Sequence, residues 1–133
     1  MRYKYIAYKY SRRSGSESVF HGTWDSFGAW SHPSRIVWRP ATDVFETRDE
    51  LVVVMELAGV TEDDMSVTLF SDLLVVEGIR HQPSVTKVNA YHQLGIKYGE
   101  FRSEVHIPFP VDTSKVKAEY NNGLLRITLT KLD

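Results

Sequence analysis

The sequence predicts an all-β protein, an antiparallel β-sandwich preceded by a flexible, aromatic-rich N-terminal arm. From Arg39 onward, about seven short runs rich in β-branched and aromatic residues alternate with turn residues. No segment shows a convincing helical repeat of apolar residues. A closed barrel has the same strand periodicity as a sandwich, so it remains an alternative.

The composition is that of a single globular domain. The chain has 133 residues, of which 42% are hydrophobic and 25% charged, and its net charge is -1. Residues 1–38 hold six Lys and Arg against two acidic residues, a charge of +4, which leaves -5 for the remainder. This imbalance indicates a basic arm on an acidic body, and +4 is too modest to predict a nucleic-acid partner.

Cysteine and long apolar runs are missing from the sequence. Without Cys there are no disulfides and no thiolate metal ligands. The longest apolar run, Leu51 to Met55, is far too short to span a bilayer, and the basic N-terminus lacks the apolar stretch of a secretory signal. We therefore expect a cytoplasmic protein without a membrane partner.

The first 38 residues are rich in aromatic side chains. Nine of the chain's sixteen aromatic residues precede Arg39, although the segment has only weak periodicity. These side chains either pack on the chain's own domain or form an adhesive arm that contacts other subunits and other proteins. We predict the second, with eight residues as the contacts: Tyr3, Tyr5, Tyr8, Tyr10, Phe20, Trp24, Phe27 and Trp30.

The first half of the predicted sandwich contains four strands. Residues 42–46 form an edge strand, and residues 50–57 are apolar on both faces, as in a strand inside a two-layer sandwich. Thr61 then caps a short helix-like turn whose first residues are acidic. Residues 65–70 alternate apolar and polar side chains, and a Ser-Asp turn leads to a β-prone run over 73–79.

A long polar stretch and three more strands follow. Residues 81–91 are polar and carry no strand pattern. The run 101–108 places apolar residues on one face and stops at a proline. The turn Asn122-Gly123 joins the last two strands, 116–120 and 124–129, because both of its residues accept a positive φ at little cost.

The polar residues form no active-site pattern. The five His residues lack the spacing of metal ligands, and the acidic trio Glu62, Asp63 and Asp64 suits a capping turn better than a cation site. Phosphate-binding glycine motifs, a nucleophile elbow and Cys do not occur. We therefore predict no enzyme activity, no metal and no cofactor.

Several motifs occur in a fixed order between Arg39 and Lys131. They are the opening DVFETRDELVVVMELAGVTEDDMSV, in which LAGV stands where LPGV is usual; LVVEGIR, from Leu74 to Arg80; YHQLGIKYGEF, with Tyr91, Tyr98, Gly99 and Phe101; Ile107-Pro108; and A-x-x-x-x-G-x-L, as Ala118, Gly123 and Leu125. In combination and order these motifs resemble the α-crystallin domain of small heat-shock proteins. The match covers about seventy per cent of the chain.

This resemblance implies an immunoglobulin-like sandwich that acts as an ATP-independent holdase, which binds partly unfolded client proteins and prevents their aggregation. It divides the chain into an N-terminal arm (1–38), an α-crystallin domain (39–131) and a remnant of a C-terminal extension (132–133). A β-sandwich adaptor that binds one folded partner, as co-chaperone domains do, is the alternative function. The long loop from His81 to Tyr98 favours the chaperone, because a compact adaptor does not need it.

The resemblance also implies self-association of the bacterial, archaeal and plant type, in which each copy lends a strand from the long loop to the partner's sheet edge. The lent strand would lie within Val88–Ile96 and the receiving edge within Thr42–Phe45. A reciprocal exchange satisfies the backbone groups of both edges symmetrically. The residues predicted for this contact are Thr42, Asp43, Val44, Phe45, Tyr91, His92, Leu94 and Ile96.

Two positions depart from the family pattern near this contact. Gly95-Ile96 stands where Glu-Arg is usual, and Ser103 stands where an Arg is common. Arg102 precedes Ser103, but strand side chains alternate between faces, so Arg102 points to the opposite side and is no simple replacement. We expect the backbone exchange to persist without the usual ionic contact.

The C-terminal tail of the family carries an I-x-I/V motif, which docks in a groove beside the last hairpin of another dimer and does not follow Thr130 here. We therefore expect a dimer or small oligomer rather than a closed multi-dimer shell. The segment Arg35–Trp38 is a second hypothesis for the occupant of the groove. The residues predicted to line it are Val67, Leu69, Val116, Ala118 and Leu125.

Overall fold

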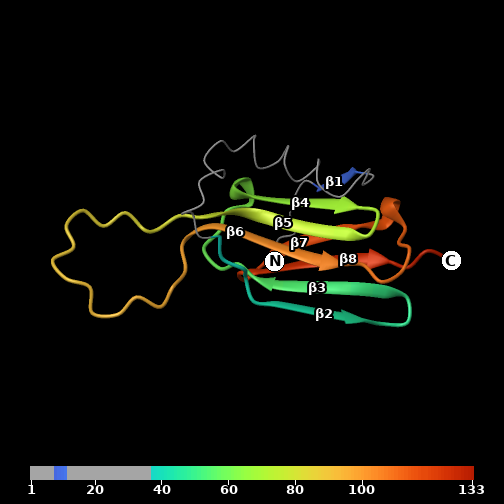
Figure 1. Ribbon diagram of the computed structural model, residues 1–133, viewed down its shortest axis with the longest axis horizontal. Helices are drawn as coiled ribbons and strands as arrows, with labels where there is room; N and C mark the ends of the chain where they lie inside the picture. Colours follow the sequence, from blue (N-terminus) through green and yellow to red (C-terminus); the bar gives the residue numbers. More distant parts are fainter. Residues whose placement is uncertain (1–7, 12–36) are drawn as a thin grey trace.

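The computed structural model describes residues 8–11 and 37–133, which form two packed β-sheets (Figure 1). One sheet has the order β1-β4-β5-β6 and the other the order β2-β3-β8-β7. The strands are β1 (Tyr8–Ser11), β2 (Thr42–Glu46), β3 (Glu50–Glu56), β4 (Met65–Phe70), β5 (Leu73–Arg80), β6 (Gly99–His106), β7 (Lys117–Asn121) and β8 (Leu124–Thr130), and the single-turn 3-10 helices are η2 (Glu62–Asp64) and η3 (Thr113–Lys115). The predicted β-sandwich is confirmed, and its two separate sheets exclude the barrel.

Alternating apolar residues from both sheets form the core. Because strand side chains alternate, one residue in two along each strand points to the inner face. Burying one such side chain fully stabilises the fold by roughly 1.5–3 kcal/mol relative to leaving it exposed. The core includes Leu51, Val53 and Met55 from β3, Val67 and Leu69 from β4, Leu74 and Val76 from β5, Phe101 and Val105 from β6, and Leu125, Ile127 and Leu129 from β8.

Each of the seven runs predicted after Arg39 forms a strand, from β2 to β8. β6 shows the largest shift, because it begins at Gly99 and ends at His106 rather than covering 101–108. The runs are recognisable because their β-branched and aromatic residues suit a pleated, half-buried surface.

β1 lies in the segment for which we predicted an irregular arm. It pairs in parallel with β4, with Tyr8 opposite Val67 and Ser11 opposite Phe70. β4 would otherwise be an edge strand, so this pairing satisfies backbone groups that an edge leaves open. A run of four residues has little pattern of its own, so periodicity could not predict it. The rest of the expected arm up to residue 36 lies outside the described residues.

The last hairpin has the predicted tight turn. Asn122 and Gly123 have φ values of 54° and 79°, both in the left-handed region. A Cβ added at Gly123 would lie 3.0 Å from the Cβ of Ala58. The carbonyl of Gly123 also accepts a hydrogen bond from the N–H of Leu57 at 2.8 Å. The hairpin therefore packs directly on the LAGV segment that follows β3.

Thr61 precedes η2 as predicted, but the prediction that it caps the turn is wrong. Its side chain accepts no hydrogen bond from the backbone of the turn. Instead, Thr61 Oγ1 donates to Asp64 Oδ2 at 2.8 Å, because a carboxylate at the end of this short turn offers a stronger, charged acceptor.

Candidate subunit interface

β2 forms one edge of its sheet and, among the described strands, pairs only with β3. In this register Val44 lies opposite Val53, and Phe45 lies opposite Val52. The two β3 residues are buried, whereas Val44 and Phe45 are 45% and 47% exposed. An apolar edge strand with open backbone N–H and C=O groups is a surface to which a further strand can pair.

The loop between β5 and β6, residues 81–98, contains no strand or helix and projects beyond the end of the sandwich (Figure 1). Its apolar side chains face solvent, with Tyr91, Leu94 and Ile96 at 59%, 72% and 65% exposure. Loops of this length without structure of their own are uncommon in compact domains and are usually functional.

The structure therefore places the two halves of the predicted contact on separate parts of one chain. Asp43 and His92 are exposed like their apolar neighbours, and Thr42 is half-buried. The tip of the loop projects away from β2, so the loop does not cover the edge of its own sheet (Figure 1). Both halves are open to a second molecule.

Arg80, the last residue of β5, holds the base of this loop together. Its Nε and Nη2 donate to the carbonyl of Lys97 at 2.9 and 2.6 Å, and Nη1 donates to the carbonyl of Ala58 at 3.2 Å. The guanidinium carbon lies 4.4 Å from the ring centroid of Trp38 and 5.7 Å from that of Tyr98, both within cation–π range. The two ends of the loop are thus tied to one side chain, which the sequence showed only as the last residue of a motif.

The model of the Hsp20/alpha crystallin family matches residues 43–133, which include the loop and most of both sheets. The chain belongs to this family. Small heat shock protein C4 of Rickettsia felis is 28% identical over 124 residues, which cover 91% of this chain and 76% of the relative. Spore protein SP21 of Stigmatella aurantiaca is 31% identical over 114 residues, which cover 81% of this chain and 68% of the relative.

Solved structures agree with the family. Heat shock protein 16.0 of Schizosaccharomyces pombe matches with a TM-score of 0.65 and 29% identity, over 71% of this chain and 88% of that one. The prediction of a small heat-shock protein, and with it of an ATP-independent chaperone, is confirmed. The adaptor alternative is not supported over it, and family membership supports self-association.

In this small heat-shock protein, Trp38 belongs to the folded body. Its N–H donates to the carbonyl of Glu100 at 3.1 Å, and its carbonyl accepts from the N–H of Arg102 at 3.0 Å. This backbone pairing holds Trp38 at the β6 edge, which is the opposite side of the sheet from β4. The hypothesis that Trp38 fills the groove beside the last hairpin is therefore wrong, while Arg35 and Ile36 lie outside the described residues.

The predicted groove residues lie in the core of the small heat-shock fold. All five (Val67, Leu69, Val116, Ala118 and Leu125) are at most 7% exposed and share one cluster. β1 runs along β4, so the backbone beside Val67 and Leu69 is already paired. Docking of a further segment against these residues stays a prediction.

Two of the eight predicted arm contacts fall in the described part of the chain. Tyr8 and Tyr10 belong to β1, opposite Val67 and Leu69 of β4. The other six lie outside it: Tyr3, Tyr5, Phe20, Trp24, Phe27 and Trp30.

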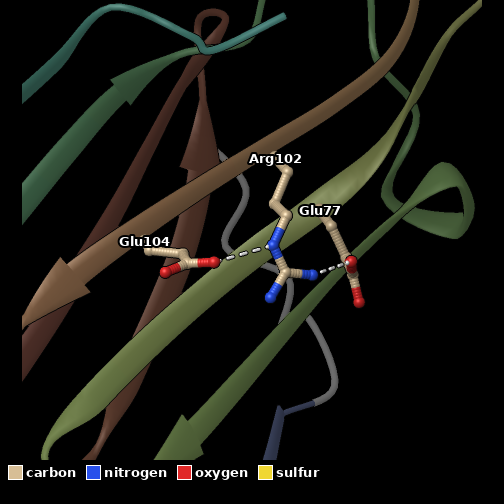
Figure 2. Close-up of polar contacts among 3 residues, drawn as sticks. All are labelled: Glu77, Arg102 and Glu104. Atoms are coloured by element: carbon tan, nitrogen blue, oxygen red, sulfur yellow. Dashed lines mark hydrogen bonds and ion pairs between the residues drawn. The ribbon is translucent and has the colours of Figure 1, made fainter. Parts of the chain in front are cut away.

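Arg102 points to the outer side of its sheet, as strand alternation predicted, while Ser103 is 1% exposed on the inner side. Its Nη1 donates to Glu77 Oε2 at 2.7 Å and its Nε donates to Glu104 Oε2 at 3.0 Å (Figure 2). Burial raises the pKa of Glu77 above its usual value, and the guanidinium of Arg102 opposes this rise in part. Arg102 is thus engaged by carboxylates of its own chain.

Within residues 8–11 and 37–133, no group of three or more His, Asp or Glu side chains is arranged to hold a metal ion. The same part of the chain contains no helix that is long and apolar enough to cross a membrane.

Proposed function

We propose that this chaperone holds partly unfolded proteins as a dimer made by reciprocal strand exchange. In this dimer the segment Val88–Ile96 of each copy pairs with β2 of the other. The observation that carries the proposal is that both surfaces expose apolar side chains in one chain, with Phe45 47% and Leu94 72% exposed. A two-fold axis buries both pairs of surfaces at once.

Burial of these side chains supplies the driving force for the exchange. Each Å² of apolar surface removed from water contributes about 25 cal/mol. Backbone hydrogen bonds along β2 add register and satisfy the open edge. The exchange requires no ion pair, in keeping with Gly95 and Ile96 in the lent segment.

Client proteins, in this proposal, contact the eight aromatic residues of the arm and the groove beside the last hairpin. An unfolding protein exposes apolar segments, and rigid aromatic side chains bury a large area per contact. We further propose that the protein catalyses no reaction, uses no cofactor and acts in the cytoplasm without nucleic-acid or membrane partners.

Light scattering of a heat-stressed model client tests the holdase activity, with and without the protein and in the absence of ATP. We expect scattering to be suppressed at a near-stoichiometric ratio of chaperone to client. Unchanged scattering over a range of ratios would contradict the activity.

A double substitution in the loop tests the dimer. Leu94→Asp with Ile96→Asp places two charges in the surface to be buried, so we expect the solution mass to fall from that of a dimer to the 15.3 kDa of one chain. Val85→Asp is the matched control, because Val85 is 66% exposed in the same loop but lies outside the lent segment. A double variant that keeps the mass of the dimer overturns the exchange.

A further inference from the structure

The outer face of the sheet β1-β4-β5-β6 carries a buried apolar cluster separate from the core. Along β5, Leu74 and Val76 point into the core, so Leu73 and Val75 point outward. Leu73 and Val75 are nevertheless only 1% and 2% exposed, and with Phe70, at 4%, they form their own cluster. The outer face of a two-layer sandwich normally meets water, so this cluster has a cover.

Charged side chains continue the same covered face. Glu77 lies directly opposite Arg102 in the register of β5 and β6, and the two side chains are 11% and 9% exposed (Figure 2). Long charged side chains on an open sheet face keep their ends in water. The cover therefore extends from Phe70 at the end of β4 across β5 to β6.

The course of the chain identifies the segment that crosses this face. Ser11 ends β1 at one edge of the sheet, and Trp38 pairs with Phe101 at the other edge. The 25 residues from 12 to 36 join these two edges. The distance is about four strand spacings, roughly 19 Å, which 25 residues span easily. Since the core fills the inner face, the short route runs over the outer face.

The chemistry of the joining segment suits an apolar surface. It contains four large aromatic residues, Phe20, Trp24, Phe27 and Trp30. Each buries about 150–250 Å² when it packs against a partner surface, which is the scale of cover that the cluster requires.

We propose that residues 12–36 dock on the outer face of the sheet of their own chain, with their aromatic side chains against Phe70, Leu73 and Val75. The occupant is the same copy, because both ends of the segment are paired to this sheet. The inference rests on the fold and not on the proposed holdase activity or on the dimer.

Site-specific thiol labelling of the full chain tests the docking, because the protein contains no Cys of its own. Val75→Cys places one thiol under the proposed cover. We expect it to react with a maleimide at least about tenfold faster when Phe20, Trp24, Phe27 and Trp30 are all replaced by Ser. Arg126→Cys, exposed on the other sheet, should react rapidly in both backgrounds.

A thiol in the core separates undocking from unfolding. Val53→Cys is fully buried between the sheets and should stay protected in both backgrounds. If it becomes reactive in the four-Ser chain, Trp24→Ser with Trp30→Ser replaces the four substitutions, and a faster reaction of Cys at position 75 alone is again expected.

Three results would overturn the proposal. The first is a thiol at position 75 that reacts as fast as the one at 126 in the otherwise unchanged chain. The second is a rate at position 75 that the Ser substitutions leave unchanged. The third is a rate that rises as the protein is diluted, because the cover then comes from another copy.

Discussion

Gly78 lies where β5 passes close to the start of β4. An added Cβ there would overlap the carbonyl oxygen of Asp64 and lie 2.8 Å from the ring of Phe101. We expect Gly78→Ala to lower the free energy of unfolding by about 3 kcal/mol, because strand backbone must move to admit a methyl group. Urea unfolding measures the loss. Gly95→Ala is the control, since no atom lies within 4 Å of its added Cβ; equal midpoints for the two variants would contradict the close approach.

Glu77 gives the stability a pH dependence of defined sign. Burial, reinforced by the charge of Glu104 and opposed by Arg102, raises its pKa in the folded state above the usual 4.5. The stabilising contribution of a carboxyl group with a raised pKa is full below the unfolded pKa and is lost as pH rises through the folded pKa.

Glu77→Gln removes this titration. We therefore expect the variant to gain stability relative to the unmodified chain as pH rises from about 4 to 7. Urea unfolding of both proteins across this range measures the difference. A difference that moves in favour of Glu77 would show that its pairing with Arg102 outweighs its burial.

Arg80 connects β5 to the far end of the loop that follows it. Lys keeps the charge but lacks the planar fork of donors that binds the carbonyls of Lys97 and Ala58. We expect Arg80→Lys to speed amide hydrogen exchange at residues 97–99 and to weaken the proposed dimer about tenfold. Hydrogen exchange and sedimentation at several concentrations measure these effects. Arg126→Lys is the control, and unchanged exchange at the loop base would contradict the role of Arg80.

The strands of the body were predictable because each is a run of β-branched or aromatic residues bounded by turn residues. β1 was not, because its pairing with β4 depends on an edge supplied by a distant part of the chain. The contacts of Trp38 with β6 and of Arg80 with the loop base were missed for the same reason. A sequence signal existed only in hindsight, as an Arg and two aromatic residues that flank the loop.

For the whole molecule, the sequence predicted a two-sheet body and located both surfaces of the candidate interface. Motif order identified the loop and the edge strand, and the structure shows their apolar residues exposed. How two copies meet is a property of a pair of molecules, which no periodicity within one chain encodes. The covered outer face was also unpredicted, because Leu73 and Val75 read as ordinary members of a β-prone run.

The contact between Gly123 and Ala58 constrains how this chain can evolve. The two residues come from motifs more than sixty positions apart, yet Leu57 and Gly123 also share a backbone hydrogen bond. A side chain that appears at position 123 collides with the segment after β3, and any change in the course of that segment removes a hydrogen bond from the hairpin. Selection therefore acts on the two motifs as one inherited unit, and a substitution in one is tolerated only when the other can accommodate it.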